Sequence, residues 1–596
     1  MFSKKKYYFF LLSGVFLIHQ YIFFNFIPNE KGFFGHDFEF FLPNFLFGKI
    51  WFQNNFLSIP WFTPSFCCGT PFHPDPQTMF YSIQQIFYII FEPILATKIL
   101  FIYFSLISYF GMFLLLKKSF NYNFNISLLG ATLFLFNGFF VYRFIVGHLG
   151  YINFSFVPLF CFFLISSLKT KNYYLSKIYL VFSALILSSS IYSGASSFIF
   201  MITLSIILVL LIFNIKYQNI KSIILKLFYS FIIAMAISLS KVSSAFFFLE
   251  NIQRNYEPVY FQSFIGYIYS SFKSFFIFPD IEYFNKLVTN EITGTIGIHE
   301  IEYGISIVPL FALIIIFFDL KKYNFFKINF NIIIIIIILC IPIILNINLF
   351  SINHIWNSIP LLRSSWLQIR WNVLFIIPII LFSLYIFSSN QLFLKKNYFT
   401  FTLILIIILQ TIIYNKSYYN NQSYNPENIV EFSKLIKQNK DLSIKGIGVI
   451  TDENKKIIKN QRNDYFKLRL SSFYCYQPIF GYNIEKFPKN KLKFNKSIKI
   501  SNKQFLQVGD VNLIKDDKNF NFLKPSCFLF PSENGCKPGE TFNKSEEEEL
   551  NNFLNYKKTK FKKNNFQKIF DLVSLITFIS SIIYIFINFA FLFKKN

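Results

Sequence analysis

Twelve apolar segments constrain the fold of this chain more than any other feature. Each is close to the roughly 20 residues that a helix needs to cross the hydrocarbon core of a bilayer. Soluble proteins do not combine 596 residues, 54% of them hydrophobic, with a mean hydropathy of +0.46. We predict an all-α polytopic membrane protein with about twelve transmembrane helices, near residues 7–27, 94–116, 126–145, 151–168, 176–193, 195–214, 223–247, 303–319, 328–348, 371–389, 398–414 and 567–593.

The net charge of +27 is explained by membrane topology better than by nucleic-acid binding. Binding to nucleic acid requires a basic face, usually with a recognisable motif, and the sequence offers neither. Lysines instead flank the apolar segments, where they orient helices in the bilayer. We therefore predict membrane lipids, and no nucleic acid, as partners.

Lysine clusters occupy alternate loops between the apolar segments. If Lys4–Lys6 are cytoplasmic, the positive-inside rule is satisfied in every second loop. The first apolar segment is long and lacks a small-residue cleavage site, so we expect it to be retained. This pattern predicts a multi-pass protein of the bacterial inner (cytoplasmic) membrane with both termini in the cytoplasm. The lysines of these loops lie at 117–118, 169–177, 216–221, 321–327, 395–396 and 594–595.

The opposite loops are longer and contain most of the acidic residues and histidines. Between the last two apolar segments lies a polar stretch with alternating patterns such as K-G-I-G-V-I-T and Y-F-K-L-R-L, which indicate strands. We predict three parts: a multi-span membrane domain, 1–414, with a first external loop, 28–80; a small extracytoplasmic α/β or β-rich domain, 415–566; and a final transmembrane helix with a cytoplasmic tail, 567–596.

Five cysteines lie on the predicted external side: Cys67, Cys68, Cys475, Cys527 and Cys536. Cys527 and Cys536 are close enough in sequence to close a small disulfide loop, which an oxidising compartment permits. The neighbouring Cys67 and Cys68 have no evident role. The cysteine spacing does not match a zinc site.

The first external loop holds two His-Asp pairs within a strongly apolar chain. Asp37, beside His36, follows the first span by about ten residues. It could act as a general base for an acceptor hydroxyl or as a ligand for a divalent cation such as Mg or Mn, and Glu39 could share that role. Capping the following helix is an equally good explanation of Asp37. His73 and Asp75 lie in P-F-H-P-D-P-Q, whose prolines stiffen a site or a plain turn.

Arginines near the predicted membrane surface are candidate phosphate ligands. Arg143, with His148, lies in a tight turn between two spans, and it binds either bulk lipid phosphate or one specific phosphate. Arg363 and Arg370 are seven residues apart, so they share a face if that segment is helical. Two guanidinium groups suit the phosphate of a lipid carrier, and anchoring to lipid headgroups is the alternative.

The stretch G-T-I-G-I-H-E-I-E-Y-G leads directly into the span at 303–319. His299, Glu300 and Glu302 place a histidine and two acids beside a flexible backbone. We expect them to form a second wall of a pocket that binds substrate.

The order of several motifs resembles that of YfhO-type bacterial membrane proteins, of the GT-C class of glycosyltransferases. The motifs are an Asp early in the first loop, W-F-T-P-S-F-C-C-G-T-P, P-D-P-Q, F-N-G-F-F-V-Y-R-F-I-V-G-H-L, H-E-I-E-Y-G and L-L-R-S-S-W-L-Q-I-R-W. The resemblance covers about the first 390 residues.

The resemblance implies a GT-C-like enzyme that transfers a hexosyl or pentosyl group from a polyprenyl-phosphate-linked donor. The acceptor would be a cell-envelope glycan, lipid or protein on the extracytoplasmic face, and Asp37 matches the acidic residue central to catalysis. A polysaccharide polymerase or ligase, a lipid-linked glycan flippase or transporter, and a non-catalytic assembly protein are alternatives. A transporter should place ionisable residues inside broken spans, and Lys241 is the main such residue here.

Overall fold

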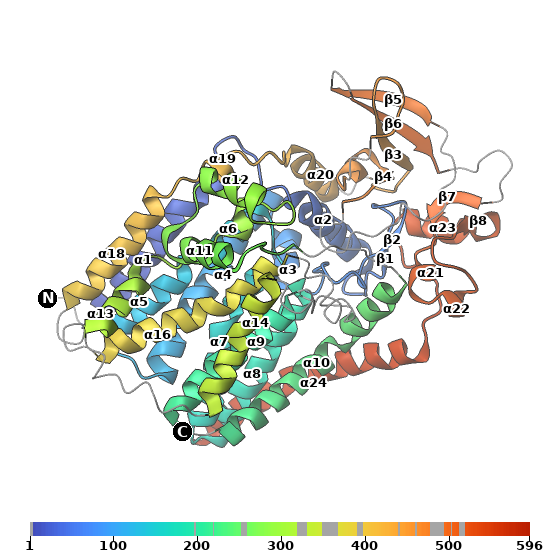
Figure 1. Ribbon diagram of the computed structural model, residues 1–596. Helices are drawn as coiled ribbons and strands as arrows, with labels where there is room; N and C mark the ends of the chain where they lie inside the picture. The colour runs from blue at the N-terminus through green and yellow to red at the C-terminus, as the bar shows by residue number, and fades with distance from the viewer. Residues whose placement is uncertain are drawn as a thin grey trace.

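The computed structural model describes twelve stretches of the chain, and it is mainly helical (Figure 1). Helices pack into a bundle, a two-stranded sheet lies in the first loop, and the other small sheets of the described residues come from the C-terminal part of the sequence. The described residues are 4–195, 198–217, 220–251, 259–318, 330–347, 367–389, 397–438, 441–458, 462–476, 494–501, 504–511 and 519–595.

The predicted spans all fall on helices. Among the described residues, eight helical stretches are long and apolar enough to cross a membrane. They contain α1 (Lys4–Phe23), α4 (Pro93–Leu114), α5 (Phe124–Leu135) with α6 (Gly138–Val146), α7 (Phe156–Lys169), α8 (Tyr173–Tyr192), α10 (Ile220–Glu250), α16 (Ile376–Ser389) and α24 (Asn565–Lys595). The remaining predicted spans correspond to shorter helices: α9 (Ile199–Tyr217), α13 (Val308–Phe318), α14 (Phe330–Asn346) and α18 (Asn397–Ile413). The prediction of a polytopic helical membrane protein is confirmed.

The span at 124–146 is broken, and the break helps to position the site. The side chain of Asn137 accepts a hydrogen bond from the backbone N–H of Phe140 at 3.1 Å, which starts α6. The N–H of Gly138 donates to the carbonyl of Tyr303 at 3.0 Å, so the broken backbone finds partners. Helix α6 ends at Gly147, whose φ of +98° and close approach to Phe38 leave no space for a side chain.

The first loop forms a compact unit instead of lying open on the membrane. The expected helix exists as α2 (Phe38–Asn55), but most of it is buried, because α3 (Ile83–Ile90) and α20 (Glu427–Lys437) pack against it. The aromatic spacing at 45–52 in the sequence suggests a helix that lies in the membrane interface. The structure instead buries most of this helix inside the protein, so that expectation is wrong. The loop also contains the short antiparallel pair β1 (Phe62–Thr63) and β2 (Thr70–Pro71).

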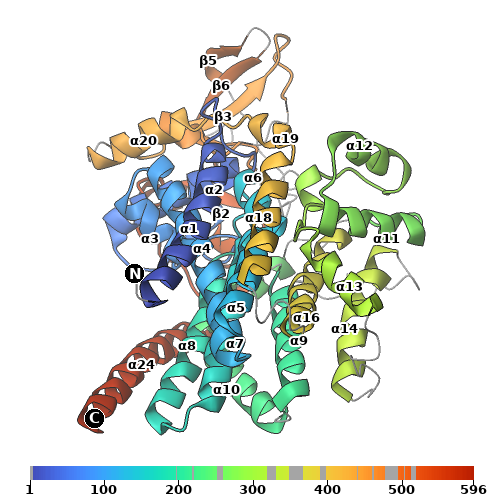
Figure 2. The same ribbon diagram turned by 90° about the vertical axis from the view of Figure 1, so that its left-hand side faces the viewer.

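The long loop before α13 and the segment after α18 supply further elements. The loop forms α11 (Phe264–Phe272) and α12 (Ile281–Asn290). The later segment begins with α19 (Ser417–Asn420), and Figure 2 shows α12, α19, α20 and the larger sheet at the end of the bundle opposite the C-terminal end of α24.

The larger sheet has the strand order β4-β3-β6-β5. Its strands are β3 (Gly446–Thr451), β4 (Leu470–Ser472), β5 (Phe494–Ser501) and β6 (Gln504–Asp510), and only the β3–β4 pair among them is parallel. The predicted strand in K-G-I-G-V-I-T is β3, whereas Y-F-K-L-R-L forms a 3-10 turn before β4. A second pair and three short helices follow: β7 (Asn519–Leu523), β8 (Thr541–Asn543), α21 (Ser526–Leu529), α22 (Pro531–Asn534) and α23 (Glu547–Leu554).

Candidate active site

A cavity of about 320 Å³ lies where the first loop meets three other parts of the chain. These parts are the turn after α6, the turn at 295–300, and the 3-10 segment Gln368–Phe375 that leads into α16. The segment 415–566, which we call the C-terminal segment, adds the side chain of Tyr476. The polar side chains that line the cavity are those of His36, Asp37, Gln77, His148, Tyr151, Thr295, His299, Glu300, Arg370 and Tyr476.

The side chain of Asp37 is directed into this cavity. The residue directly precedes α2, but its side chain makes no capping hydrogen bond, so the explanation as a helix cap is wrong. Its Oδ2 lies 2.8 Å from Nε2 of His148, and its Oδ1 accepts a hydrogen bond of 2.6 Å from the hydroxyl of Tyr476. The backbone N–H of Asp37 donates to the carbonyl of Val146, which fixes the loop against the end of α6.

Asp37 is held as a carboxylate. Burial by itself raises its pKa, but the charges of His148 and His36 and the hydrogen bonds from His148 and Tyr476 outweigh that effect. The pKa of Asp37 therefore lies below its usual range. Burial and the adjacent Asp37 raise the pKa of Tyr476, so the phenol keeps the proton that it donates.

Glu300 is the second carboxylate of the cavity, and two arginines converge on it. Arg370 donates from Nε to Oε2 at 2.9 Å and from Nη2 to Oε1, and Arg143 donates from Nη2 to Oε2 at 3.2 Å. Arg370 also donates to the hydroxyl of Tyr151. Burial raises the pKa of Glu300, but Arg370 and His299 hold it well below its usual value. The pair is bidentate, which fixes the guanidinium plane.

Three histidines stand beside the two carboxylates. One ring nitrogen from each of His36, His148 and His299 lies within 4.8 Å of the others. His36 is exposed and the other two are buried. Burial lowers the pKa of His299 to about 3, so its imidazole is neutral, the form that can ligate a metal. The three imidazoles beside the Asp37 carboxylate form a donor set that can hold a divalent cation.

The structure brings several of the predicted site residues together in this cavity. Asp37, His36, His148, Glu300 and Arg370 line one cavity, as does His299, although they come from distant parts of the chain. Arg143 does not line it, because its fully buried guanidinium lies against Glu300 and the ring of Phe139.

The other candidates lie outside the cavity. Glu39 faces Arg462, with Oε1 3.6 Å from its Nε, and burial raises the pKa of Glu39 to about 7. His73 and Asp75 are buried in a turn whose carbonyls accept hydrogen bonds from Lys241.

Glu302 is fully buried and has no hydrogen-bond partner among the residues that the structure describes. Burial raises its pKa well above the usual value, in spite of the charges of Arg143 and Lys416. Arg363 lies outside the described residues.

Four polar residues of the cavity were not singled out from the sequence: Gln77, Tyr151, Thr295 and Tyr476. Gln77 belongs to the P-D-P-Q motif, and its buried amide group has no hydrogen-bond partner within the described parts of the chain. The two tyrosines carry no sequence signal, because they are two of 35 in the chain.

Comparisons with known proteins give little independent support for a function. No family model and no curated protein matches the chain. Among solved structures, it is similar to an oligosaccharyltransferase of Archaeoglobus fulgidus in complex with Zn and sulfate, at 13% identity and a TM-score of 0.37. The similarity covers 78% of this chain but only 62% of that protein, and we base no conclusion on it. The resemblance to YfhO-type proteins stays a prediction.

Proposed function

We propose that this chain is a GT-C-type membrane glycosyltransferase that moves a sugar from a polyprenyl-phosphate-linked donor to a cell-envelope acceptor on the extracytoplasmic face. One observation carries the proposal: the buried first-loop carboxylate Asp37 shares a cavity with Arg370 and three histidines. Charged groups in such a cavity act on a substrate more strongly than they do in water. The 415–566 segment, as a domain of its own, would help to select the acceptor.

The proposed reaction is an inverting transfer. The acceptor hydroxyl attacks the anomeric carbon, the bond from that carbon to the phosphate oxygen breaks, and polyprenyl phosphate leaves. The proton released by the acceptor hydroxyl is taken up by the departing phosphate. Arg370 is the residue best placed to bind the departing phosphate, because it lines the cavity and its fork-shaped donors match phosphate oxygens. A substrate phosphate would compete with Glu300 for this guanidinium.

Asp37 orients the acceptor and helps to hold a cation. A carboxylate whose pKa lies below its usual range is a weak proton acceptor but a good ligand for positive charge. His36, His148 and His299 complete the set, and their nitrogen atoms favour a transition metal such as Mn or Zn over Mg. A bound divalent cation would supply positive charge for the departing phosphate.

Lys241 weighs against a flippase or transporter. It is a buried lysine within α10, and its ammonium group donates to the carbonyls of His73 and Asp75 and to the hydroxyl of Thr78. Its partners therefore belong to the first loop. These contacts favour a structural role for Lys241 over a role in a transport path.

The deciding experiment compares purified wild type with Asp37→Asn. We expect the variant to lose most of its ability to release sugar from a polyprenyl-phosphate donor, because an amide can neither balance positive charge nor accept both hydrogen bonds. Asp441→Asn is the matched control, since Asp441 is an exposed carboxylate paired with Arg469. A folded Asp37→Asn protein with full activity would refute the assignment.

A further inference from the structure

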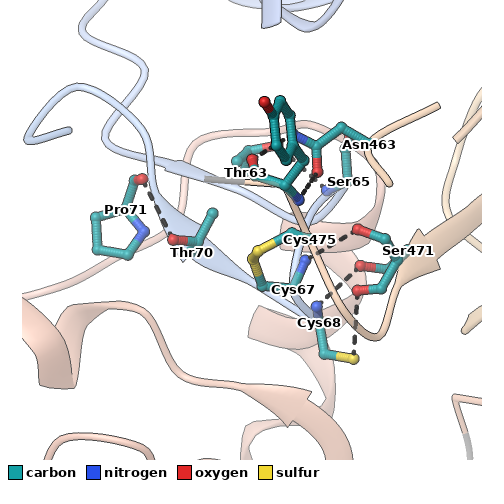
Figure 3. Close-up of a disulfide and its surroundings, with 11 residues drawn as sticks. Thr63, Ser65, Cys67, Cys68, Thr70, Pro71, Asn463, Ser471 and Cys475 are labelled. Carbon is teal, nitrogen blue, oxygen red and sulfur yellow. Dashed lines mark hydrogen bonds between the residues drawn. A yellow bond between two sulfur atoms is a disulfide. The ribbon is translucent and has the colours of Figure 1, made fainter. Parts of the chain in front are cut away.

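The cavity is completed by a residue from the C-terminal segment. Tyr476 lies more than 400 residues after Asp37, and its hydroxyl donates a hydrogen bond of 2.6 Å to that carboxylate. The preceding residue, Cys475, forms a disulfide with Cys67 of the first loop. Figure 3 shows this disulfide between the β1–β2 loop and the segment that follows β4, the strand that contains Ser471.

The first-loop end of this connection is held firmly. Cys67, Cys68 and Gly69 all have positive φ, of 55°, 58° and 110°, a conformation that residues other than glycine adopt only when neighbours enforce it. The N–H of Cys68 donates to the side chain of Ser471 at 3.1 Å and to the carbonyl of Ser472 at 3.1 Å. The thiol of Cys68 points to the carbonyl of Ser472, so Cys67 is the one that reaches Cys475.

The other end is held just as firmly. The side-chain amide of Asn463 donates to the carbonyl of Tyr476 at 2.9 Å, and its oxygen accepts from the N–H of Tyr476 at 3.0 Å. The disulfide at Cys475 and the two hydrogen bonds between the Asn463 side chain and the backbone of Tyr476 therefore restrict the position of the tyrosine ring. Its hydroxyl is thereby presented to Asp37.

We propose that Tyr476 is a positioning residue for Asp37, and that the Cys67–Cys475 disulfide keeps it in place by joining the first loop to the C-terminal segment. The inference rests on the proposed function for its effect on catalysis. The second disulfide, Cys527–Cys536, closes a loop of nearby residues, and neither of its cysteines lines the cavity. It therefore provides the matched control.

The test uses the full-length protein in four forms besides wild type. They are Tyr476→Phe, the pair Cys67→Ser/Cys475→Ser, the combination of the two, and the control pair Cys527→Ser/Cys536→Ser. Losing one hydrogen bond to a charged group corresponds to about a 10- to 100-fold effect, which we expect in kcat and not in the KM for the donor.

The decisive comparison is between the single changes and their combination. If the disulfide acts through Tyr476, the serine pair loses kcat by itself, and adding Tyr476→Phe to it causes no further loss. The control pair retains the wild-type kcat. Full kcat in Tyr476→Phe, an effect on KM alone, or a combined loss equal to the product of the separate losses overturns the proposal.

A second measurement does not depend on activity. Peptide mapping without reductant should find Cys67 linked to Cys475, and its absence overturns the proposal. In the serine pair, hydrogen exchange should increase in residues 36–41 and 471–476, whereas the control pair leaves both segments protected. If wild type transfers no sugar but hydrogen exchange increases in the serine pair, the proposed function fails, whereas the role of the disulfide and Tyr476 in positioning Asp37 stands. Unchanged hydrogen exchange refutes that positioning role.

Discussion

Changing Glu300 to Gln should destabilise the protein more than its small change in shape suggests. The carboxylate is 2% exposed in its side chain, and it balances Arg143 and Arg370, whose side chains are 0% and 7% exposed. The amide of Gln keeps one oxygen acceptor but removes the negative charge. Two buried guanidinium groups then lose their counter-ion.

Removing one partner of a buried ion pair typically costs about 3–5 kcal/mol, because the remaining charge stays out of water. An unfolding entropy of about 2.1 cal/mol/K per residue converts this into a fall in Tm of at least about 2–4 °C for a chain of this length. Transmembrane helices keep much of their structure on unfolding, so the true entropy is smaller and the fall is larger.

Thermal unfolding of the purified protein in one detergent measures the effect. Glu282→Gln is the control, because Glu282 pairs with Lys286 at 2.8 Å with both side chains largely exposed, and such pairs contribute less than about 1 kcal/mol. Adding Arg370→Gln to Glu300→Gln should recover part of the stability, since one unpaired charge disappears. A Tm of Glu300→Gln equal to that of wild type would contradict this prediction. A double variant with a Tm below that of Glu300→Gln alone would contradict it as well.

Two further substitutions test other buried groups. Burial raises the pKa of Glu302 above the ordinary value of 4.5, so the folded protein keeps this proton and wild type loses stability as the pH rises above that value. The variant Glu302→Gln lacks this dependence. Its Tm relative to that of wild type should therefore increase from about pH 5 to about pH 8. Lys241→Met removes the donor to the carbonyls of His73 and Asp75, each 2.6 Å away, and should cost about 1–3 kcal/mol per unsatisfied acceptor; the exposed Lys221→Met should leave Tm unchanged.

The sequence was sufficient for features that depend on local composition. Apolar length alone located the spans, because a bilayer core sets the length of a helix that crosses it. Asp37, His148, Glu300 and Arg370 stood out as candidate site residues because ionisable residues are scarce in an apolar chain. Ionisable groups are costly near lipid, so they occur mainly where they are paired or functional.

Features that depend on distant packing could not be predicted. The aromatic spacing of α2 indicates a helix, but only the later segment with α20 reveals that both sides of it are covered. Cys67 pairs across a separation of 408 residues, and nothing in the sequence selects Cys475 from the other cysteines. Tyr476 gives no signal for the same reason, because its role depends on that pairing.

The charges of the cavity indicate how substrate and cation should depend on each other. Asp37 and Glu300 are carboxylates, Arg143 and Arg370 are guanidinium groups, and His299 is neutral. Apart from His36 and His148, these groups already cancel, with Arg143 contacting Glu300 and not lining the cavity. A phosphate that enters the cavity therefore brings negative charge that the two carboxylates and two guanidinium groups do not compensate.

A divalent cation on the three histidines would supply the missing positive charge, and each ligand should then strengthen the binding of the other. Because such coupling is reciprocal, polyprenyl phosphate should tighten Mn²⁺ binding by the same factor by which Mn²⁺ tightens polyprenyl phosphate binding, typically about 5- to 150-fold. Calorimetric titration of each ligand, with and without the other, measures both factors. His299→Ala should abolish the coupling and Asp441→Asn should retain it, whereas equal phosphate affinity with and without Mn²⁺ would show that the histidines do not hold the compensating charge.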